Sequence, residues 1–256
     1  MTNKTKYPIF ILSKARAKQC LTANLFEKYN TDFKIVVEPQ DFNSYKQVYN
    51  ENKLIIMDRD NAGIAYVRNY IKSFSKSHND MYHWQIDDNI SNFRRRIDNK
   101  NTLINPLENL LYVEDYVSVY NNIGLAGLKH RAFAFASKVD LSFNQQIYSC
   151  FLVNNTLDIS WRSGLIEDTD YSLQVLYKNY CTVMFNRLII DKAKTMSMKG
   201  GNTEISHGGD GRENRSIGLQ KMWPDIFYLT EQYGRIKVKP SRIWSKFSQR
   251  PIKNES

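Results

Sequence analysis

Short apolar runs alternate with helix-like segments through the first third of the 256-residue chain. The runs at 7–12, 33–37 and 53–57 have the length and apolar character of buried strands. Between residues 61 and 76, apolar side chains recur at three- and four-residue spacing, which is typical of an amphipathic helix. Strands that alternate with helices predict βαβ units and a largely parallel sheet with its strand ends on one side. We therefore expect an α/β fold.

The rest of the sequence predicts further helices and strands. We expect a helix over 107–121 and strands over 131–137, 146–154 and 181–190, with 146–154 opening a more antiparallel region. Another apolar helix is expected to follow the acidic run 167–170. The length suits one large α/β domain, or one domain with an extension.

Two segments near the C-terminus differ in composition from the rest. Residues 199–216 are polar and rich in glycine, as is typical of a mobile lid over a site. The stretch 235–256 is basic and contains Trp244 and Phe247, which suits contact with phosphates and bases. The same aromatic side chains would also serve to dock the stretch on the protein. We assign 1–234 to the main domain and 235–256 to a basic extension that packs on or near it.

The chain carries a formal net charge of +10, which favours a polyanionic partner such as a nucleic acid or a phosphorylated substrate. Three consecutive arginines at 94–96 contribute to this charge directly after an acidic motif. A basic balance is also common among soluble proteins, and it identifies no particular acceptor.

The three cysteines are widely spaced, which fits reduced thiols and not a disulfide framework or a zinc site. No apolar run reaches the length of about 18 residues that a transmembrane helix needs. The short run at 9–12 is not the core of a signal peptide. We expect a cytoplasmic protein with no membrane partner, and we favour a monomer.

The apolar and aromatic run that starts at Tyr82 stops at Asp87, Asp88 and Asn89. A strand that ends in acidic oxygens suits a hard cation such as Mg²⁺ or Mn²⁺, which often takes one or two carboxylates plus substrate phosphates. In open α/β sheets the ligand crevice lies outside the carboxyl ends of the strands. Because Asp and Asn also favour turns, a solvated turn is the alternative interpretation.

Residues near the ends of the first strands are candidates for binding a phosphorylated ligand. Ser13 and Arg16 follow the first strand, and Glu38 ends the second. Gly63 lies in a small-residue turn that would let a phosphate approach the backbone, and Arg68 would pair with it. Helix packing would also explain Gly63. The segment is not a Walker loop, and it has no dinucleotide fingerprint.

A second acidic pair, Glu167 and Asp168, lies far along the chain from Asp87. One carboxylate site for a metal and one for proton removal are the minimum for metal-assisted transfer to a hydroxyl. Asp168 would act as the base, and Glu167 would orient it or bind the acceptor. Capping of the following helix explains the pair equally well.

The glycine-rich segment adds Lys199, Gly200, Gly201 and His207 to the candidate residues. His207 would complete the metal shell or contact a pyrophosphate, although a lone histidine in a polar loop is more often exposed. A hydrolase with a serine or cysteine nucleophile has little support, since no G-x-S-x-G motif is present.

Taken in order, these motifs resemble those of GT-A-fold glycosyltransferases. The whole chain resembles the phage group called TET/JBP-associated glycosyltransferases, implicated in decorating hydroxymethylated pyrimidines in DNA. The matching segments are 8–16, 37–39, 63–69, 87–89 and 167–168. The resemblance implies a GT-A-like Rossmann-type mixed sheet flanked by helices, with a basic C-terminal extension. It also implies a host-cytoplasmic enzyme if the chain is phage-encoded.

The resemblance implies metal-dependent transfer of a sugar from a nucleotide sugar, most simply a UDP-sugar, to a hydroxyl on a 5-hydroxymethyl-type pyrimidine in DNA. Mn²⁺ or Mg²⁺ would bind at Asp88, Asn89 and His207, although Asn89 departs from a plain DxD motif and leaves open which oxygens hold the metal. Asp168 would be the base of an inverting reaction, with Glu167 beside it. The implied donor-binding residues are Ser13, Arg16, Glu38, Gly63, Arg68, Asp87, Asp88, Lys199, Gly200 and Gly201.

Three other functions remain open on the sequence. A glycosyltransferase acting on a glycan or protein fits the same motifs. A metal-dependent nucleotidyltransferase also uses acidic strand ends, but it would normally need a better phosphate loop after the first strand. A DNA-binding module explains the charge and leaves the acidic motifs unexplained. The sugar, the base and the anomeric outcome are not specified.

Overall fold

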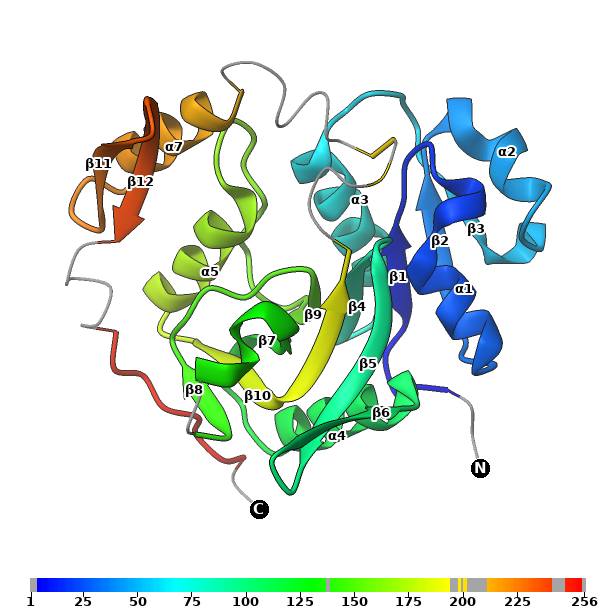
Figure 1. Ribbon diagram of the computed structural model, residues 1–256, viewed down its shortest axis with the longest axis horizontal. Coiled ribbons are helices and arrows are strands. Elements are labelled where there is room, and N and C mark those ends of the chain that lie inside the picture. The colour runs from blue at the N-terminus through cyan, green and yellow to red at the C-terminus, as the bar shows by residue number, and fades with distance from the viewer. Residues whose placement is uncertain are drawn as a thin grey trace.

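The structure, a computed structural model, describes residues 4–136, 139–193, 198, 200–201, 211–240 and 247–254. A ten-stranded mixed sheet runs through the described part of the chain (Figure 1), in the order β3-β2-β1-β4-β9-β7-β10-β5-β6, and β8 pairs with β10. A separate two-stranded sheet, β11-β12, lies near the C-terminus. The expected α/β class, a mixed sheet flanked by helices, is confirmed.

The N-terminal part of the sheet is parallel. Strands β1 to β4 pair side by side in one direction, and three helices connect them. The strands are β1 (Ile9–Leu12), β2 (Lys34–Val37), β3 (Leu54–Ile56) and β4 (Tyr82–Asp87). The helices are α1 (Leu21–Lys28), α2 (Phe42–Lys46) and α3 (Ile64–Ser77).

The remaining strands make the sheet mixed. β9 is antiparallel to β4 and β7, β10 is parallel to β7, and β5 is antiparallel to β10 and β6. Their bounds are β5 (Ile90–Ile97), β6 (Lys100–Ile104), β7 (Ile123–His130), β8 (Leu141–Phe143), β9 (Cys150–Asn154) and β10 (Cys181–Lys192). These pairings give β7 and β10 the same direction as β1 and β4, so the carboxyl ends of all four strands lie at one edge.

Helices cover both faces of the sheet because successive side chains of a strand point to opposite faces. In β1, Ile9 and Ile11 pack on the face covered by α1 and α4 (Pro106–Ser118). Phe10 and Leu12 pack on the other face, against Val67 and Ile71 of α3. Helix α5 (Glu167–Tyr177) covers the β7 and β9 part of that second face. Asn105 caps α4, where its side chain accepts from the Leu107 N–H.

A helix and a hairpin in the C-terminal part of the chain lie outside the main sheet. Helix α7 (Gly211–Met222) is followed by β11 (Phe227–Gln232) and β12 (Arg235–Pro240). Of the segment expected to be a glycine-rich loop, residues 211–216 are helical instead, because Arg212, Glu213 and Arg215 supply good helix formers. Residues 202–210 lie outside the described residues.

One expected strand is wrong. Residues 131–137 alternate small and aromatic side chains, which predicts a strand, but Arg131–Ala136 forms a 3-10 helix. The sequence reasoning missed β7, which ends at His130 directly before it. Because the chain leaves the sheet there, the segment pairs with no strand of the described part of the chain, and its backbone closes hydrogen bonds locally.

Three further features bear on the sequence-based expectations. Cys20, Cys150 and Cys181 are buried and unpaired, as expected of reduced thiols. The arginines at 94–96 lie on β5, where they alternate between the two faces and so do not form one basic patch; Arg94 pairs with Asp191 at 2.7 Å. Within the described residues, none of the helices combines the length and the apolar character needed to span a bilayer.

Candidate active site

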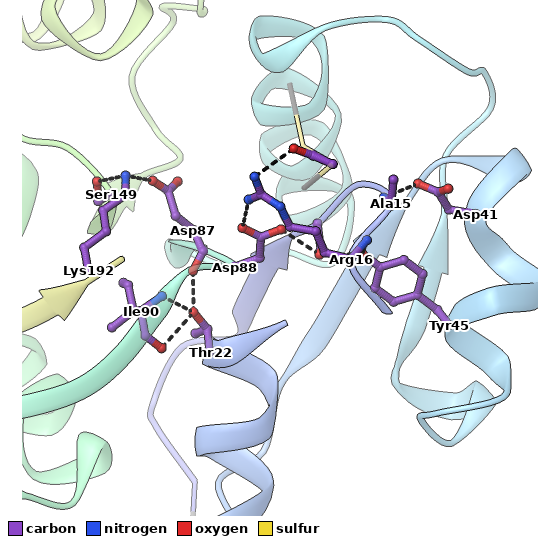
Figure 2. Close-up of polar contacts among 12 residues, drawn as sticks. Ala15, Arg16, Thr22, Asp41, Tyr45, Asp87, Asp88, Ile90, Ser149 and Lys192 are labelled. Carbon is purple, nitrogen blue, oxygen red and sulfur yellow. Dashed lines mark hydrogen bonds and ion pairs between the residues drawn. The ribbon is translucent and has the colours of Figure 1, made fainter. Parts of the chain in front are cut away.

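The neighbouring carboxylates at the end of β4 point in different directions (Figure 2). The Asp87 side chain reaches toward Lys192 and Ser149, whereas the Asp88 side chain reaches toward Arg16. Thr22, in the first turn of α1, holds the turn between them and β5: its Oγ1 donates to the Asp87 carbonyl and accepts from the Ile90 N–H at 3.0 Å. The two carboxylates therefore belong to two separate networks at this edge of the sheet.

Asp88 belongs to a network at the end of β1. Its Oδ2 accepts from the Ser13 hydroxyl at 2.9 Å, and its Oδ1 pairs with the Arg16 guanidinium at 2.8 Å. The Tyr45 hydroxyl contacts Ser13 Oγ at 2.5 Å and accepts from the Arg16 N–H at 3.1 Å. Asp88 is 5% exposed, so the alternative of a solvated turn does not describe it.

Asp87 belongs to a second network that joins strands β4 and β10. Lys192, at the end of β10, donates to Asp87 Oδ2 at 2.7 Å and to Ser149 Oγ at 2.8 Å. On its other oxygen, Asp87 lies 3.4 Å from the Arg68 guanidinium. Asp87 is thus held between two cations from different elements.

Arg68 brings the two acidic motifs together, although they are far apart in the sequence. Its Nη2 lies 3.4 Å from Asp87 Oδ1 and 3.2 Å from Asp168 Oδ1. The side chain is only 2% exposed, and its guanidinium lies over the Phe151 ring at 4.8 Å. Gln85 Oε1 accepts from Nη1 at 3.2 Å. Such a buried cation fixes the position of both carboxylates.

Glu167 and Asp168 open helix α5 without capping it. The N-cap residue is Ile166, and no side-chain cap bond is made, so the capping interpretation does not explain the pair. Glu167 pairs instead with Arg215 of α7 at 3.3 Å, and Asp168 pairs with Arg68. The Asp168 side chain remains 13% exposed.

The environments of these carboxylates separate their pKa values. Burial raises the pKa of Asp168 to about 7, against the opposing charge of Arg68, and Glu167 and Asp87 add to the rise. Burial also acts to raise the pKa of Asp87, but Lys192 and Arg68 outweigh it and hold that pKa below its usual range. Burial raises the pKa of Asp88 against the charge of Arg16. Groups whose pKa values are pushed apart in this way are candidates for different acid–base roles.

Glu38 lies at the same edge of the sheet as Ser13 and Arg16. It is buried and pairs with Lys14 at 2.9 Å. Gly63 precedes α3 with a φ of +80°, and a Cβ built there would meet no atom of the described residues within 4 Å. Backbone conformation therefore accounts for this glycine, and helix packing does not.

Gly200 and Gly201 lie directly on the segment that follows β1. The Gly200 carbonyl accepts from Arg16 Nη2 at 2.8 Å, and the Gly201 N–H donates to the Lys14 carbonyl at 2.9 Å. A Cβ on Gly200 would lie 2.5 Å from the Ala15 carbonyl oxygen. Of the other candidates in this segment, Lys199 and His207 lie outside the described residues.

Besides Thr22, Tyr45 and Ser149, the sequence reasoning missed three further residues of the site. Lys192 lies just past the end of the strand expected at 181–190. Because ligands bind outside the carboxyl ends of strands in open α/β sheets, its position could have marked it as a candidate. His130 ends β7, and its Nδ1 is buried without a hydrogen-bond partner among the described residues. Burial, together with the charge of Lys192, lowers its pKa. Nothing in the sequence indicated that Arg215 belongs to the site, because its contact with Glu167 depends on how α7 packs against α5.

The oxygen donors at the end of β4 fit a hard divalent cation. Within the described residues, no three His, Cys, Asp or Glu side chains are grouped to hold a metal ion on their own. Asn89 Oδ1, however, is buried with no hydrogen-bond partner in the described part of the chain. The Asp88 carboxylate and this amide oxygen are the kinds of ligand taken by a cation such as Mg²⁺ or Mn²⁺ whose other ligands come from substrate phosphates.

The five candidate carboxylates at this edge of the sheet each have a cationic partner. The pairs are Glu38 with Lys14, Asp88 with Arg16, Asp87 with Lys192 and Arg68, Asp168 with Arg68, and Glu167 with Arg215. The fold and the site thus define a mixed α/β protein with a network of carboxylates and cations at the carboxyl ends of its strands.

Within that class, the sequence matches the family model of the TET-associated glycosyltransferases over residues 7–201. The chain belongs to this family. The match includes all the strand-end residues described above and ends before α7 and the β11–β12 hairpin. A search of curated proteins finds no match.

Solved structures show distant likenesses. The crystal structure of GalNAc-T7 with UDP, GalNAc and Mn²⁺ is 8% identical with a TM-score of 0.49, over 73% of this chain and 44% of that one. A structure assigned as a glucose-1-phosphate thymidylyltransferase from Bacillus anthracis, in complex with a sucrose, is 13% identical with a TM-score of 0.44, over 76% of this chain and 88% of that one. The chain spans less than half of the GalNAc-T7 chain it matches.

Proposed function

We propose that the protein transfers a sugar from a nucleotide-sugar donor, a UDP-sugar, to the hydroxyl of a 5-hydroxymethyl-type pyrimidine in DNA. The observation that carries the sugar-transfer chemistry is Arg68, which holds Asp168 beside the strand-end carboxylate Asp87. The DNA acceptor is supported by the net charge of +10 and by the resemblance to the phage glycosyltransferase group.

The donor diphosphate would bind at the ends of β1 and β10. Arg16 and Lys192 approach Asp88 and Asp87 from opposite sides (Figure 2), so a diphosphate placed between them would meet a cation on each flank. Charge-assisted hydrogen bonds of this kind are about twice as strong as neutral ones. Arg16 and Lys192 would stabilise the negative charge that develops on the departing UDP.

The transfer step would use Asp168 as the base. The acceptor oxygen attacks the anomeric carbon of the sugar, and the proton of the attacking hydroxyl passes to Asp168. The bond from the anomeric carbon to the diphosphate oxygen breaks, and its electron pair leaves with UDP. A single displacement of this kind inverts the anomeric configuration, which NMR of the product would show.

The metal-binding role falls on Asp88 and Asn89. Bound Mn²⁺ or Mg²⁺ would supply Lewis-acid stabilisation of the diphosphate. We expect Asn89→Ala to raise the Mn²⁺ concentration at half-saturation by roughly tenfold or more, the scale seen when a supporting group at a metal site is lost. Electron paramagnetic resonance of free Mn²⁺ measures this directly.

Asn92→Ala, a change on the neighbouring strand β5, is the matched control and should leave the Mn²⁺ titration as in the wild type. Asn89→Asp places a carboxylate at this position, so it should tighten Mn²⁺ binding. An unchanged midpoint in both Asn89 variants would remove the amide from the metal site.

The rate of transfer should depend on pH through Asp168. Because a base must be deprotonated to accept a proton, and the Asp168 pKa is raised to about 7, kcat/KM should rise as pH passes through about 7 and level off above it. Glu167 contributes to the raised pKa, so Glu167→Gln should move the inflection to lower pH. A profile that is flat across neutral pH, or that falls with rising pH, would contradict this assignment.

The decisive experiment offers duplex DNA containing 5-hydroxymethylcytosine or 5-hydroxymethyluracil, a panel of nucleotide sugars, and Mn²⁺ or Mg²⁺. Nucleoside mass spectrometry should show a gain of one sugar on the modified base, and unmodified DNA should show none. No gain with any sugar overturns the DNA acceptor. Release of pyrophosphate instead of UDP would identify a nucleotidyltransferase.

A further inference from the structure

The β11–β12 hairpin has two chemically different faces. Its register places Tyr228 opposite Lys239, Thr230 opposite Lys237, and Gln232 opposite Arg235. Since opposite residues of an antiparallel pair lie on the same face, these six side chains form one face, which we call the basic face. It carries three cations and no carboxylate.

The other face anchors the hairpin. Phe227 and Val238 pack with Leu219 of α7 and with Ile226 in a small hydrophobic cluster. The Ile236 N–H donates to Glu213 Oε1 of α7 at 3.3 Å. The hairpin is therefore attached to α7 by its apolar side, and its basic face is directed away from that contact.

Most of the basic face and the turn beside it are open to solvent, and Thr230 and Lys237 are half-buried. Tyr228 is 51% exposed, and Tyr233, in the turn, is 90% exposed. The Lys237 ammonium lies 5.6 Å from the centre of the Tyr233 ring. Exposed cations on one face suit a partner that offers closely spaced phosphates.

We propose that the basic face of the β11–β12 hairpin binds duplex DNA, an inference that rests on the proposed function. A two-stranded β-ribbon fits the B-form major groove, which is about 12 Å wide, and Arg and Lys side chains neutralise the phosphates on its rims. The major groove of duplex RNA is too narrow to admit the ribbon, so the geometry selects DNA.

The hairpin is connected to the candidate active site through α7. Arg215 of α7 pairs with Glu167, the neighbour of Asp168. Gly218 of α7 lies so close to Gly164 that a Cβ there would be 2.5 Å from the Gly164 carbonyl oxygen. Figure 1 shows α7 and the hairpin beyond α5, on the opposite side of the molecule from α1 and α2. DNA on the basic face would thus approach the crevice from the side of α5.

The test replaces Arg235, Lys237 and Lys239 by glutamine in the full chain. Binding to a fluorescein-labelled duplex, measured by anisotropy across a salt series, should weaken at least tenfold. The slope of log K against log salt should shrink by roughly 2–3, since each lost phosphate contact removes about 0.9. A control with the same change in charge replaces Lys28, Lys46 and Lys100, which are exposed on α1, α2 and β6, and should bind as the wild type does.

The outcomes separate this inference from the proposed function. Transfer to a free 5-hydroxymethyl nucleoside should be unchanged in the hairpin variant, while transfer to duplex DNA falls through a higher KM. Equal binding and an equal salt slope in the hairpin variant and the wild type overturn the inference, whatever the enzyme transfers. So does tighter binding of duplex RNA than of duplex DNA. If the wild type glycosylates no DNA and the hairpin variant still loses duplex binding, the surface stands and the acceptor assignment fails.

Discussion

Asp168→Asn is expected to lower kcat for sugar transfer by about 10²–10⁴-fold, the range that a positioned general base contributes. Asparagine has nearly the same shape as aspartate but cannot take the proton of the acceptor hydroxyl. Arg68 keeps its contact with Asp87, so the crevice retains its ion pair and the donor should bind as before. Steady-state kinetics with a saturating nucleotide sugar measures the loss.

Asp158→Asn is a matched control, because Asp158 is exposed, lies before α5 and is not one of the residues of the site networks described above. It should leave kcat unchanged. Donor affinity measured by calorimetry should be similar in the wild type and in Asp168→Asn. A loss of kcat below tenfold in Asp168→Asn would remove Asp168 from the role of base.

Arg68→Met is expected to lower the free energy of unfolding by about 3–5 kcal/mol, the cost of removing one partner from a buried ion pair. The variant leaves Asp168 without its guanidinium partner and Asp87 with only Lys192. Methionine preserves much of the apolar contact with the Phe151 ring, so the effect reports on the charge. Urea unfolding followed by circular dichroism measures it.

Helix α3 provides a control four residues further on. Lys72 is also buried, but its ammonium donates to the Leu157 and Ile159 carbonyls and to the Tyr171 hydroxyl, and it pairs with no carboxylate among the described residues. Lys72→Met should therefore cost less stability than Arg68→Met and should leave transfer intact. The double variant Arg68→Met with Asp168→Asn should recover part of the stability lost in Arg68→Met. A loss as large in Lys72→Met would show that burial alone, and not the ion pairs, sets the effect.

The parallel part of the fold and its strand ends were predictable because each depends on local patterns. The apolar runs of β1, β2 and β4, and the spacing in α3, are read within a few residues. Parallel strands then bring Ser13, Glu38 and Asp87 to one edge. No such local pattern describes the pairing of Arg68 with both acidic motifs, since it depends on how α3 and α5 pack across the sheet.

The hairpins show a different limit. Asp98 and Asn99 in the β5–β6 turn have φ values of +47° and +61°, and Tyr233 and Gly234 in the β11–β12 turn have +55° and +67°. Asp-Asn is close to the preferred sequences of such turns, so the first hairpin had a usable signal that was missed. The second has a bulky residue where these turns favour Asn, Asp or Gly, and the packing of the hairpin on α7 compensates.

The divergence of Asp87 and Asp88 has a consequence for how the protein can vary. The two residues are adjacent in the chain. Asp88 accepts a hydrogen bond from Ser13 at the end of β1, whereas Asp87 pairs with Arg68 of α3 and Lys192 of β10. A substitution near Ser13 can change the surroundings of Asp88 without affecting Asp87. A substitution near Lys192 can change the surroundings of Asp87 without affecting Asp88. An inserted or deleted residue between the two carboxylates would instead turn one of them away from its partners. The spacing of the two carboxylates is therefore fixed, whereas the residues around each carboxylate can be substituted independently of those around the other.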